Sequence, residues 1–329
     1  MKLLIFVAAL IFLGCDDDPA AVPDDPDPVN SAWTTWTTTD GLPHGVVTGI
    51  EVAPDGSLWF NHAIEGGGGV THFNGTTFTH YDESNGLPTN LVLWFRAIAT
   101  QATGDVWVGT HEHGVMHFDG ENWSTHTKAD GLGGDTVVAV TVAPNGDIWC
   151  IGDGVSRLRD DSWTDWPLPT LGLDPLAFSV GVCADGEVWV GGMRMACYDG
   201  EAWTFREHLL PTGPATAVAV APDGSVWVGG DGVTRFDGEN RRHFSLQEMG
   251  LGPFGDMGIG SIAIDDARVV WASTWGQGVV SFDGEDWTQF RSADGLLDDV
   301  TSSVAIDHEG ALWVGSNLGL SRYMPTDQD

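Results

Sequence analysis

The sequence predicts an all-β fold, a seven-bladed β-propeller in which each blade is a four-stranded antiparallel sheet. A tryptophan recurs seven times at intervals of 48, 42, 40, 38, 44 and 42 residues, which is the length of one propeller blade. A tight acidic or glycine turn precedes each tryptophan, and an isoleucine or valine stands nine positions before it. The recurring residues are Trp59, Trp107, Trp149, Trp189, Trp227, Trp271 and Trp313.

The unit at residues 300–323 shows the elements of one blade in order. An alternating strand at 300–306 leads through a turn to a second strand at 311–315, and a short loop leads to a third strand at 320–323. Elsewhere the third strand ends in an Asp-Gly pair, which supplies the positive φ angles that hairpins require. An outer strand with its own tryptophan then follows, and these tryptophans are Trp123, Trp163, Trp203 and Trp287.

The last repeat lacks an outer strand, because the chain beyond Tyr323 contains no fourth strand pattern. The missing strand is at the other end of the sequence, where Ala32-Trp33-Thr34-Thr35-Trp36 has the pattern of the other outer strands. We therefore expect residues 31–38 to complete the seventh blade and close the ring, which removes the free sheet edges.

These units are similar to the repeats of the two-component-regulator propeller family. The resemblance rests on Asp294-Gly295-Leu296, Gly310-Ala311-Leu312-Trp313-Val314-Gly315 and Gly319-Leu320-Ser321-Arg322-Tyr323, and on the unit that begins at Asp130, and it covers nearly all of residues 31–323. It implies a propeller like those in the periplasmic sensors of hybrid histidine kinases, which are associated with glycan-fragment sensing. This chain shows no kinase, DNA-binding segment or later membrane helix, so we expect a ligand-binding or partner-binding propeller.

The N-terminal segment predicts a lipid-anchored protein of the bacterial cell envelope, either periplasmic or at the cell surface. Residues 1–15 form a signal peptide with an apolar run that is too short to span a bilayer, and its end resembles a lipobox with Cys15 as the acylated residue. The alternative is an ordinary cleaved signal in which Cys15 is incidental. Residues 16–30 are an acidic, proline-rich tether without the apolar content to fold, and the propeller occupies 31–329.

Composition restricts the partners of the protein. The net charge is −34 with 13 lysines and arginines, which excludes nucleic acid as a ligand because phosphate binding requires cationic neutralisation. The same charge leaves the Cys15 lipid as the expected membrane contact. The other cysteines, Cys150, Cys183 and Cys197, match no zinc motif, and we expect them to be buried free thiols.

Candidate binding residues lie on the loop face, which we define as the face formed by the loops between blades and the loops joining second to third strands. Sequence variation in such loops on a repetitive scaffold indicates binding. His111 and His113 flank Glu112 and could point the same way in an extended segment, which suits a shared divalent metal or an acid/base pair with Glu112. The further candidates in these loops are His62, Arg194 and Trp275.

Arg96 is a further candidate because it stands where the first strands of other blades have uncharged residues. Its guanidinium could bind an anionic sugar or pair with Glu51 on the neighbouring first strand. The pattern of the residues leaves both roles open.

Three functions compete at this point. The first is a non-enzymatic, monomeric binding protein without a cofactor, which recognises a carbohydrate or an envelope protein through the loop face. The second is a propeller lyase that acts on a lactone or an acidic polysaccharide, with His111 or His113 as base and Arg96 or Arg194 neutralising a carboxylate. The third is a structural assembly module.

Overall fold

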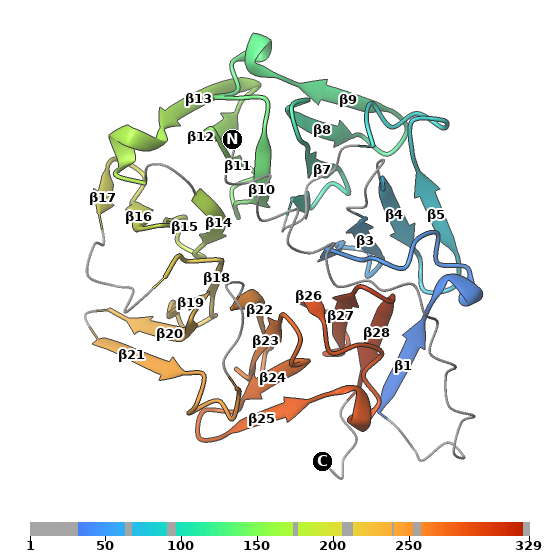
Figure 1. Cartoon of the computed structure of the whole chain (residues 1–329). Coiled ribbons are helices and arrows are strands. Elements are labelled where there is room, and N and C mark those ends of the chain that lie inside the picture. The colour runs from blue at the N-terminus through green and yellow to red at the C-terminus, as the bar shows by residue number, and fades with distance from the viewer. Residues whose placement is uncertain are drawn as a thin grey trace. The chain divides into compact units, whose positions relative to one another are not determined.

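The seven repeats form seven four-stranded antiparallel sheets arranged in a ring, as the computed structural model shows in Figure 1. The structure describes residues 32–62, 68–90, 97–173, 177–205, 213–238, 240–252 and 258–324. The chain separates into two units, Met1–Ser31 and Ala32–Asp329. The first unit lies outside the described residues, and the predicted lipidation site Cys15 lies with it. The predicted fold class is confirmed.

The blades follow one another in chain order, and each contains its strands from the innermost to the outermost. Blades 1 to 4 are β2 (Gly49–Val52), β3 (Leu58–Asn61), β4 (Val70–Phe73), β5 (Phe78–Tyr81); β6 (Ile98–Thr100), β7 (Val106–Gly109), β8 (Val115–Phe118), β9 (Trp123–His126); β10 (Val137–Val142), β11 (Ile148–Gly152), β12 (Gly154–Arg159), β13 (Ser162–Pro167); and β14 (Ala177–Val182), β15 (Val188–Gly192), β16 (Met195–Tyr198), β17 (Trp203–Phe205). Blades 5 to 7 are β18 (Ala217–Val220), β19 (Val226–Gly230), β20 (Gly232–Asp237), β21 (Asn240–Ser245); β22 (Ile259–Ile264), β23 (Val270–Thr274), β24 (Val279–Phe282), β25 (Trp287–Phe290); and β26 (Thr301–Ile306), β27 (Leu312–Ser316), β28 (Leu320–Tyr323) with β1 (Trp33–Trp36). Short 3-10 helices, η2 (Thr38–Asp40), η3 (Lys128–Asp130), η4 (Leu168–Leu171) and η5 (Ser292–Asp294), follow four of the outer strands.

The N-terminal strand closes the ring, as the sequence predicts. β1 pairs with β28 in antiparallel register, from Trp33 opposite Tyr323 to Trp36 opposite Leu320. The first strands of successive blades contact one another around the whole ring, and β26 contacts β2 where the two ends of the propeller meet. The seventh blade therefore joins the beginning and the end of the propeller through backbone hydrogen bonds.

The tryptophan of each second strand fills the space between its own blade and the next one. Trp59 of blade 1 lies 5.7 Å from the ring of Phe118 in blade 2, and Trp149 of blade 3 lies 5.6 Å from Tyr198 in blade 4. Trp313 of blade 7 lies 6.1 Å from Phe73 in blade 1, so the same contact is made across the closure. These large aromatic side chains pack between neighbouring sheets, where aromatic contacts stabilise the interface.

The Asp-Gly-Leu segments are turns, as the sequence predicts. The Asp130 carboxylate accepts hydrogen bonds from the backbone N–H (2.8 Å) and hydroxyl (2.9 Å) of Thr127. Gly131 follows with a φ of 105°, which a residue with a side chain rarely adopts. Leu132 then enters the core with 3 % of its surface exposed. The aspartates thus act as capping residues.

The ring has two faces with different connections. The loop face carries the connections between blades and from second to third strands. The opposite face, which we call the turn face, carries the turns between first and second strands and between third and fourth strands. None of the helices in the described part of the chain has the length and apolar character needed to cross a membrane.

The cysteines of the propeller are free thiols, as expected, and all three are buried. Burial raises the pKa of the Cys183 thiol to about 12, and it also raises the pKa of Cys150. These thiols therefore pack as small apolar side chains.

Candidate functional site

The segment with His111 and His113 forms an exposed bend on the loop face. Glu112 has a φ of 65°, so the backbone turns there and the extended geometry expected from the sequence is wrong. The Nδ1 atom of His113 lies 3.0 Å from the carbonyl oxygen of His111. Because this oxygen can only accept, Nδ1 carries the proton in the neutral ring, and Nε2 is left as an acceptor. This hydrogen bond restrains the ring of His113, which is exposed on the loop face.

A second group of histidines gathers in blade 1. The ring of His44 lies 5.2 Å from that of His62 and 5.0 Å from that of His80. His62 is fully buried, with Nδ1 2.8 Å from the carbonyl oxygen of Val46 and Nε2 2.8 Å from the hydroxyl of Thr71. The same hydroxyl lies 3.0 Å from Nδ1 of His80. His62 was a predicted contact residue, and the structure places it beneath the surface.

Burial determines the protonation of this group. Burial lowers the pKa of His62 to about 3, and it also lowers the pKa of His80. Neutral His62 donates from Nδ1 to the carbonyl of Val46 and accepts at Nε2 from the hydroxyl of Thr71, so both ring nitrogens are satisfied. The group acts as a buried polar network.

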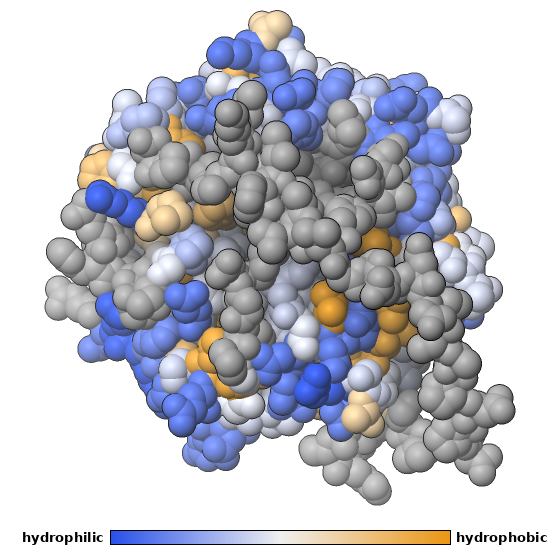
Figure 2. Space-filling model, viewed as in Figure 1, coloured by the Kyte–Doolittle hydropathy of each residue, from blue (hydrophilic) through white to orange (hydrophobic). Residues whose placement is uncertain are grey.

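Large hydrophobic side chains are exposed at the loop face of blades 4 and 7. Met193 is 49 % exposed in the loop between β15 and β16, and Phe205 is 49 % exposed at the end of β17. Leu318, in the loop between β27 and β28, is 57 % exposed. Arg194 is exposed beside Met193. Elsewhere the rim of the ring is mostly hydrophilic, as Figure 2 shows.

Trp275 lies at the loop end of blade 6 and leans over the innermost strand. Its indole nitrogen occupies the space beside Gly260, where a Cβ atom would lie 2.9 Å away. This contact explains why the first strand of blade 6 has glycine where blades 1, 5 and 7 have Thr48, Thr216 and Ser302. Gln277 holds the neighbouring loop by hydrogen bonds to the backbone N–H (2.9 Å) and carbonyl (3.0 Å) of Gly252. Trp275 is half-buried and presents an aromatic surface at the loop face.

Glu51, the predicted partner of Arg96, lies on the first strand of blade 1. Arg96 itself lies outside the described residues, so its role stays a prediction. Glu51 of β2 accepts hydrogen bonds from the backbone N–H (3.4 Å) and hydroxyl (3.3 Å) of Thr100 in blade 2. It lines a central cavity of about 320 Å³ between the first strands.

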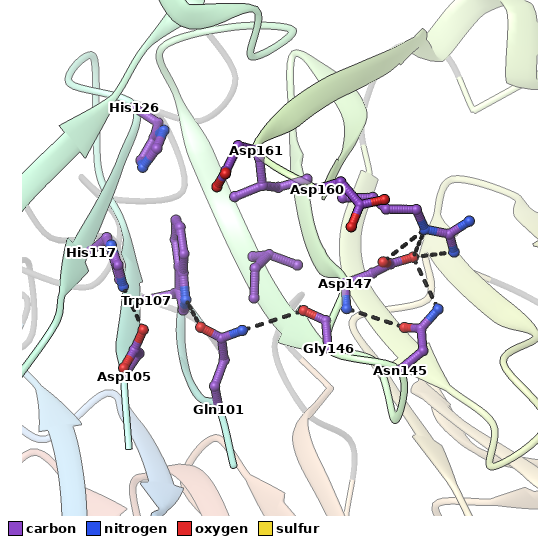
Figure 3. Close-up of a pocket in the computed structure, with 13 residues that line it drawn as sticks. Gln101, Asp105, Trp107, His117, His126, Asn145, Gly146, Asp147, Asp160 and Asp161 are labelled. Atoms are coloured by element: carbon purple, nitrogen blue, oxygen red, sulfur yellow. Dashed lines mark hydrogen bonds and ion pairs between the residues drawn. The ribbon is translucent and has the colours of Figure 1, made fainter. Parts of the chain in front are cut away.

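A pocket of about 370 Å³, which the sequence does not predict, lies on the turn face between blades 2 and 3 (Figure 3). The ring of His117 stacks on that of Trp107 at 4.1 Å, and its Nε2 lies 3.0 Å from the carboxylate of Asp105. On the other side Arg159 pairs with Asp147. The sequence alone does not reveal this pocket, because it depends on the strand register that pairs His117 of the third strand with Trp107 of the second strand.

The polar side chains of this pocket are largely engaged with one another. Gln101 accepts from the indole N–H of Trp107 at 2.9 Å and donates to the carbonyl of Gly146 at 3.3 Å. Burial lowers the pKa of His126, so this ring is neutral at pH 7. Within the described ranges, no group of three His, Cys, Asp or Glu residues is arranged to hold a metal ion. The pocket therefore forms a hydrogen-bonded junction between two blades.

No protein-family model matches the sequence, and no curated protein matches it. Among solved structures, the chain is similar to the extracellular domain of the hybrid two-component system BT3049 from B. thetaiotaomicron, with a TM-score of 0.69, 16 % identity, and coverage of 90 % of this chain and 42 % of that chain. It is also similar to virginiamycin B lyase from Staphylococcus aureus with quinupristin, with a TM-score of 0.71, 14 % identity, and coverage of 89 % and 99 %. A third structure is PorZ, a surface component of the type-IX secretion system of Porphyromonas gingivalis, with a TM-score of 0.65, 17 % identity, and coverage of 85 % and 46 %.

These similarities show the fold. The chain spans about two fifths of the length of the two-component extracellular domain. The predicted resemblance to two-component propellers is thus confirmed at the level of architecture: the chain is a seven-bladed propeller similar in fold to the extracellular domains of hybrid two-component systems.

Proposed function

We propose that this protein is a monomeric, lipid-anchored binding protein of the cell envelope that recognises a partner through its loop face. The observation that carries the proposal is the location of Met193, Phe205 and Leu318, the large hydrophobic side chains that are exposed among the described residues. All three lie at the loop face. Met, Phe and Arg are enriched where proteins bind one another, and Arg194 stands beside Met193.

Two ligand classes fit different parts of this face. Met193, Arg194 and Phe205 on blade 4 fit a protein partner, whereas the half-buried indole of Trp275 on blade 6 fits stacking on a sugar ring. The extracellular location is supported by the apolar run that precedes Cys15 and by similarity in fold to extracellular domains.

The test compares two variants of the full-length chain. A double substitution, M193S with F205S, should abolish capture of an envelope protein from crosslinked membranes and leave binding to oligosaccharides unchanged. W275A should weaken binding to an oligosaccharide array by about tenfold, which corresponds to about 1.4 kcal/mol, because it removes the aromatic surface on which the sugar ring would stack. If both variants retain every interaction of the wild type, the loop face is not the binding surface.

A lyase remains the second candidate function, because His113 is held with Nε2 free to accept a proton. This function predicts turnover of a lactone or an acidic polysaccharide that H113A abolishes, with R194A weakening the use of acidic substrates. Turnover that survives H113A would exclude His113 as the base. Binding without turnover would favour the binding protein.

A further inference from the structure

A groove of about 290 Å³ on the turn face lies between blades 5 and 6 and has an unusual charge. It is lined by Arg235 of β20, Arg242 of β21 and Arg268 of the turn between β22 and β23. Two carboxylates also line it, those of Asp223 and Asp283. Arginines therefore outnumber carboxylates among the residues that line the groove, in a protein whose net charge is −34.

Arg242 breaks the pattern of the seven blades at its position. It stands directly opposite Arg235 on the neighbouring strand, a like-charge pair that is destabilising in a sheet. In each of the six other blades, the residue at this position of the outer strand carries a hydroxyl group. These residues are Thr34, Thr79, Ser124, Thr164, Thr204 and Thr288.

Arg268 breaks a second pattern in the adjacent blade. It occupies the left-handed position of the turn between the first and second strands, with a φ of 69°. The other six blades have glycine at this position, namely Gly56, Gly104, Gly146, Gly186, Gly224 and Gly310, with φ between 81° and 95°. A residue with a side chain is strained in this region of the backbone, and such strain persists most often where a site requires it. Both departures from the repeat thus cost stability, and both place an arginine in the same groove.

The contacts of the arginines leave Arg242 as the one without an ion pair among the described residues that line the groove. Arg235 pairs with Asp237 at 3.4 Å and with Asp223 at 3.6 Å, and Nη1 of Arg268 lies 3.9 Å from the same Asp223 carboxylate. The Arg242 guanidinium lies 4.3 Å from the ring centre of Phe244, which fixes its plane and leaves its N–H edge available. Of the described residues, none forms an ion pair with Arg242.

We infer that this groove binds a small ligand through a carboxylate held by Arg242 and Arg268. Its volume is at the lower end of small-molecule sites, and the guanidinium fork matches the geometry of a carboxylate. A monoanion would pair with Arg242, whereas a dianion such as sulfate would bring a second negative charge close to Asp223 and Asp283. The net charge of −34 repels large polyanions, which favours a small ligand.

The experiment titrates the full-length chain with galacturonate and with galactose, which differs from it by the absence of the carboxylate, at low ionic strength. Galacturonate should bind saturably, galactose should not, and sodium sulfate should bind more weakly than galacturonate. The substitutions R242T and R268G restore the residues of the other blades, and each should weaken galacturonate binding by about tenfold, the loss expected for one charge-assisted hydrogen bond. K128T removes the same charge on an exposed site elsewhere and should leave the affinity unchanged.

Stability separates this role from a structural one. If Arg268 serves binding at the expense of the fold, R268G should leave the melting temperature unchanged or raise it while binding is lost. The inference is overturned if galacturonate binds no better than galactose, if R242T and R268G bind it as tightly as the wild type, or if R268G lowers the melting temperature and leaves binding intact. Sulfate binding as tight as galacturonate binding would overturn the carboxylate assignment.

Discussion

The closure of the ring by β1 can be tested by replacing Trp33 with alanine. Trp33 is 7 % exposed, its ring lies 4.9 Å from that of Tyr323 on the paired strand, and it lies 6.2 Å from Phe290 of blade 6. A buried tryptophan removes about 150–250 Å² from water, which corresponds to about 4–6 kcal/mol. Measured tryptophan and phenylalanine to alanine replacements in cores cost about 3–5 kcal/mol. We expect W33A to lower the free energy of unfolding by about 3–5 kcal/mol, a fall in melting temperature on the order of 10 °C.

The assay is calorimetric or urea-induced unfolding of the full-length chain, with W287A as the matched control. Trp287 stands opposite Phe282 as Trp33 stands opposite Tyr323. The strand of Trp287, β25, follows the third strand of its own blade in sequence, whereas β1 comes from the other end of the propeller. Trp287 is also only half-buried, so its loss should cost less than that of Trp33. If W33A unfolds within about 1 kcal/mol of the wild type while W287A loses more, β1 does not close the ring.

Two further predictions concern buried groups. Burial lowers the pKa of His62 from the ordinary value of 6.5 to about 3, so between these pH values the unfolded chain binds a proton that the folded chain excludes. The stability that neutral His62 contributes is therefore complete above pH 6.5. Below that pH, the free energy of unfolding should fall by about 1.4 kcal/mol per pH unit until about pH 3. Denaturant midpoints measured across this range should show a shallower decline in H62Q, and an equal decline in both proteins would contradict the assignment. Because Cys150, Cys183 and Cys197 are buried, a thiol reagent should modify none of them in the native protein and all three after unfolding, as peptide mass mapping would show; native labelling at Cys150 would contradict its burial.

The fold was predictable because its signals are local and repeated. The second-strand tryptophans and the turns recur in every blade, so seven weak patterns support one another. Closure by residues 33–36 was also predictable, since their pattern matches that of the other outer strands. The strand pairing confirms both.

The site was less predictable because it depends on register and on backbone turns that spacing does not determine. His111 and His113 were expected in an extended segment, but the positive φ of Glu112 bends it. His80 joins His62 because β4 and β5 pair so that Thr71 lies between the two rings. The groove arginines did leave a signal, since Arg241-Arg242 stands where other outer strands have a tryptophan or phenylalanine followed by threonine or serine.

The two turn-face grooves show how a repeat can carry different chemistry at equivalent places. Between blades 2 and 3 the basic side chains have carboxylate partners, His117 with Asp105 and Arg159 with Asp147, and further carboxylates make the pocket acidic. Between blades 5 and 6 the same kind of junction has three arginines and two carboxylates. The tryptophan beneath each groove and the strand register around it are the same in both. The difference in charge is therefore not required by the architecture, and it marks the junction of blades 5 and 6 as the place where sequence departs from what the propeller alone needs.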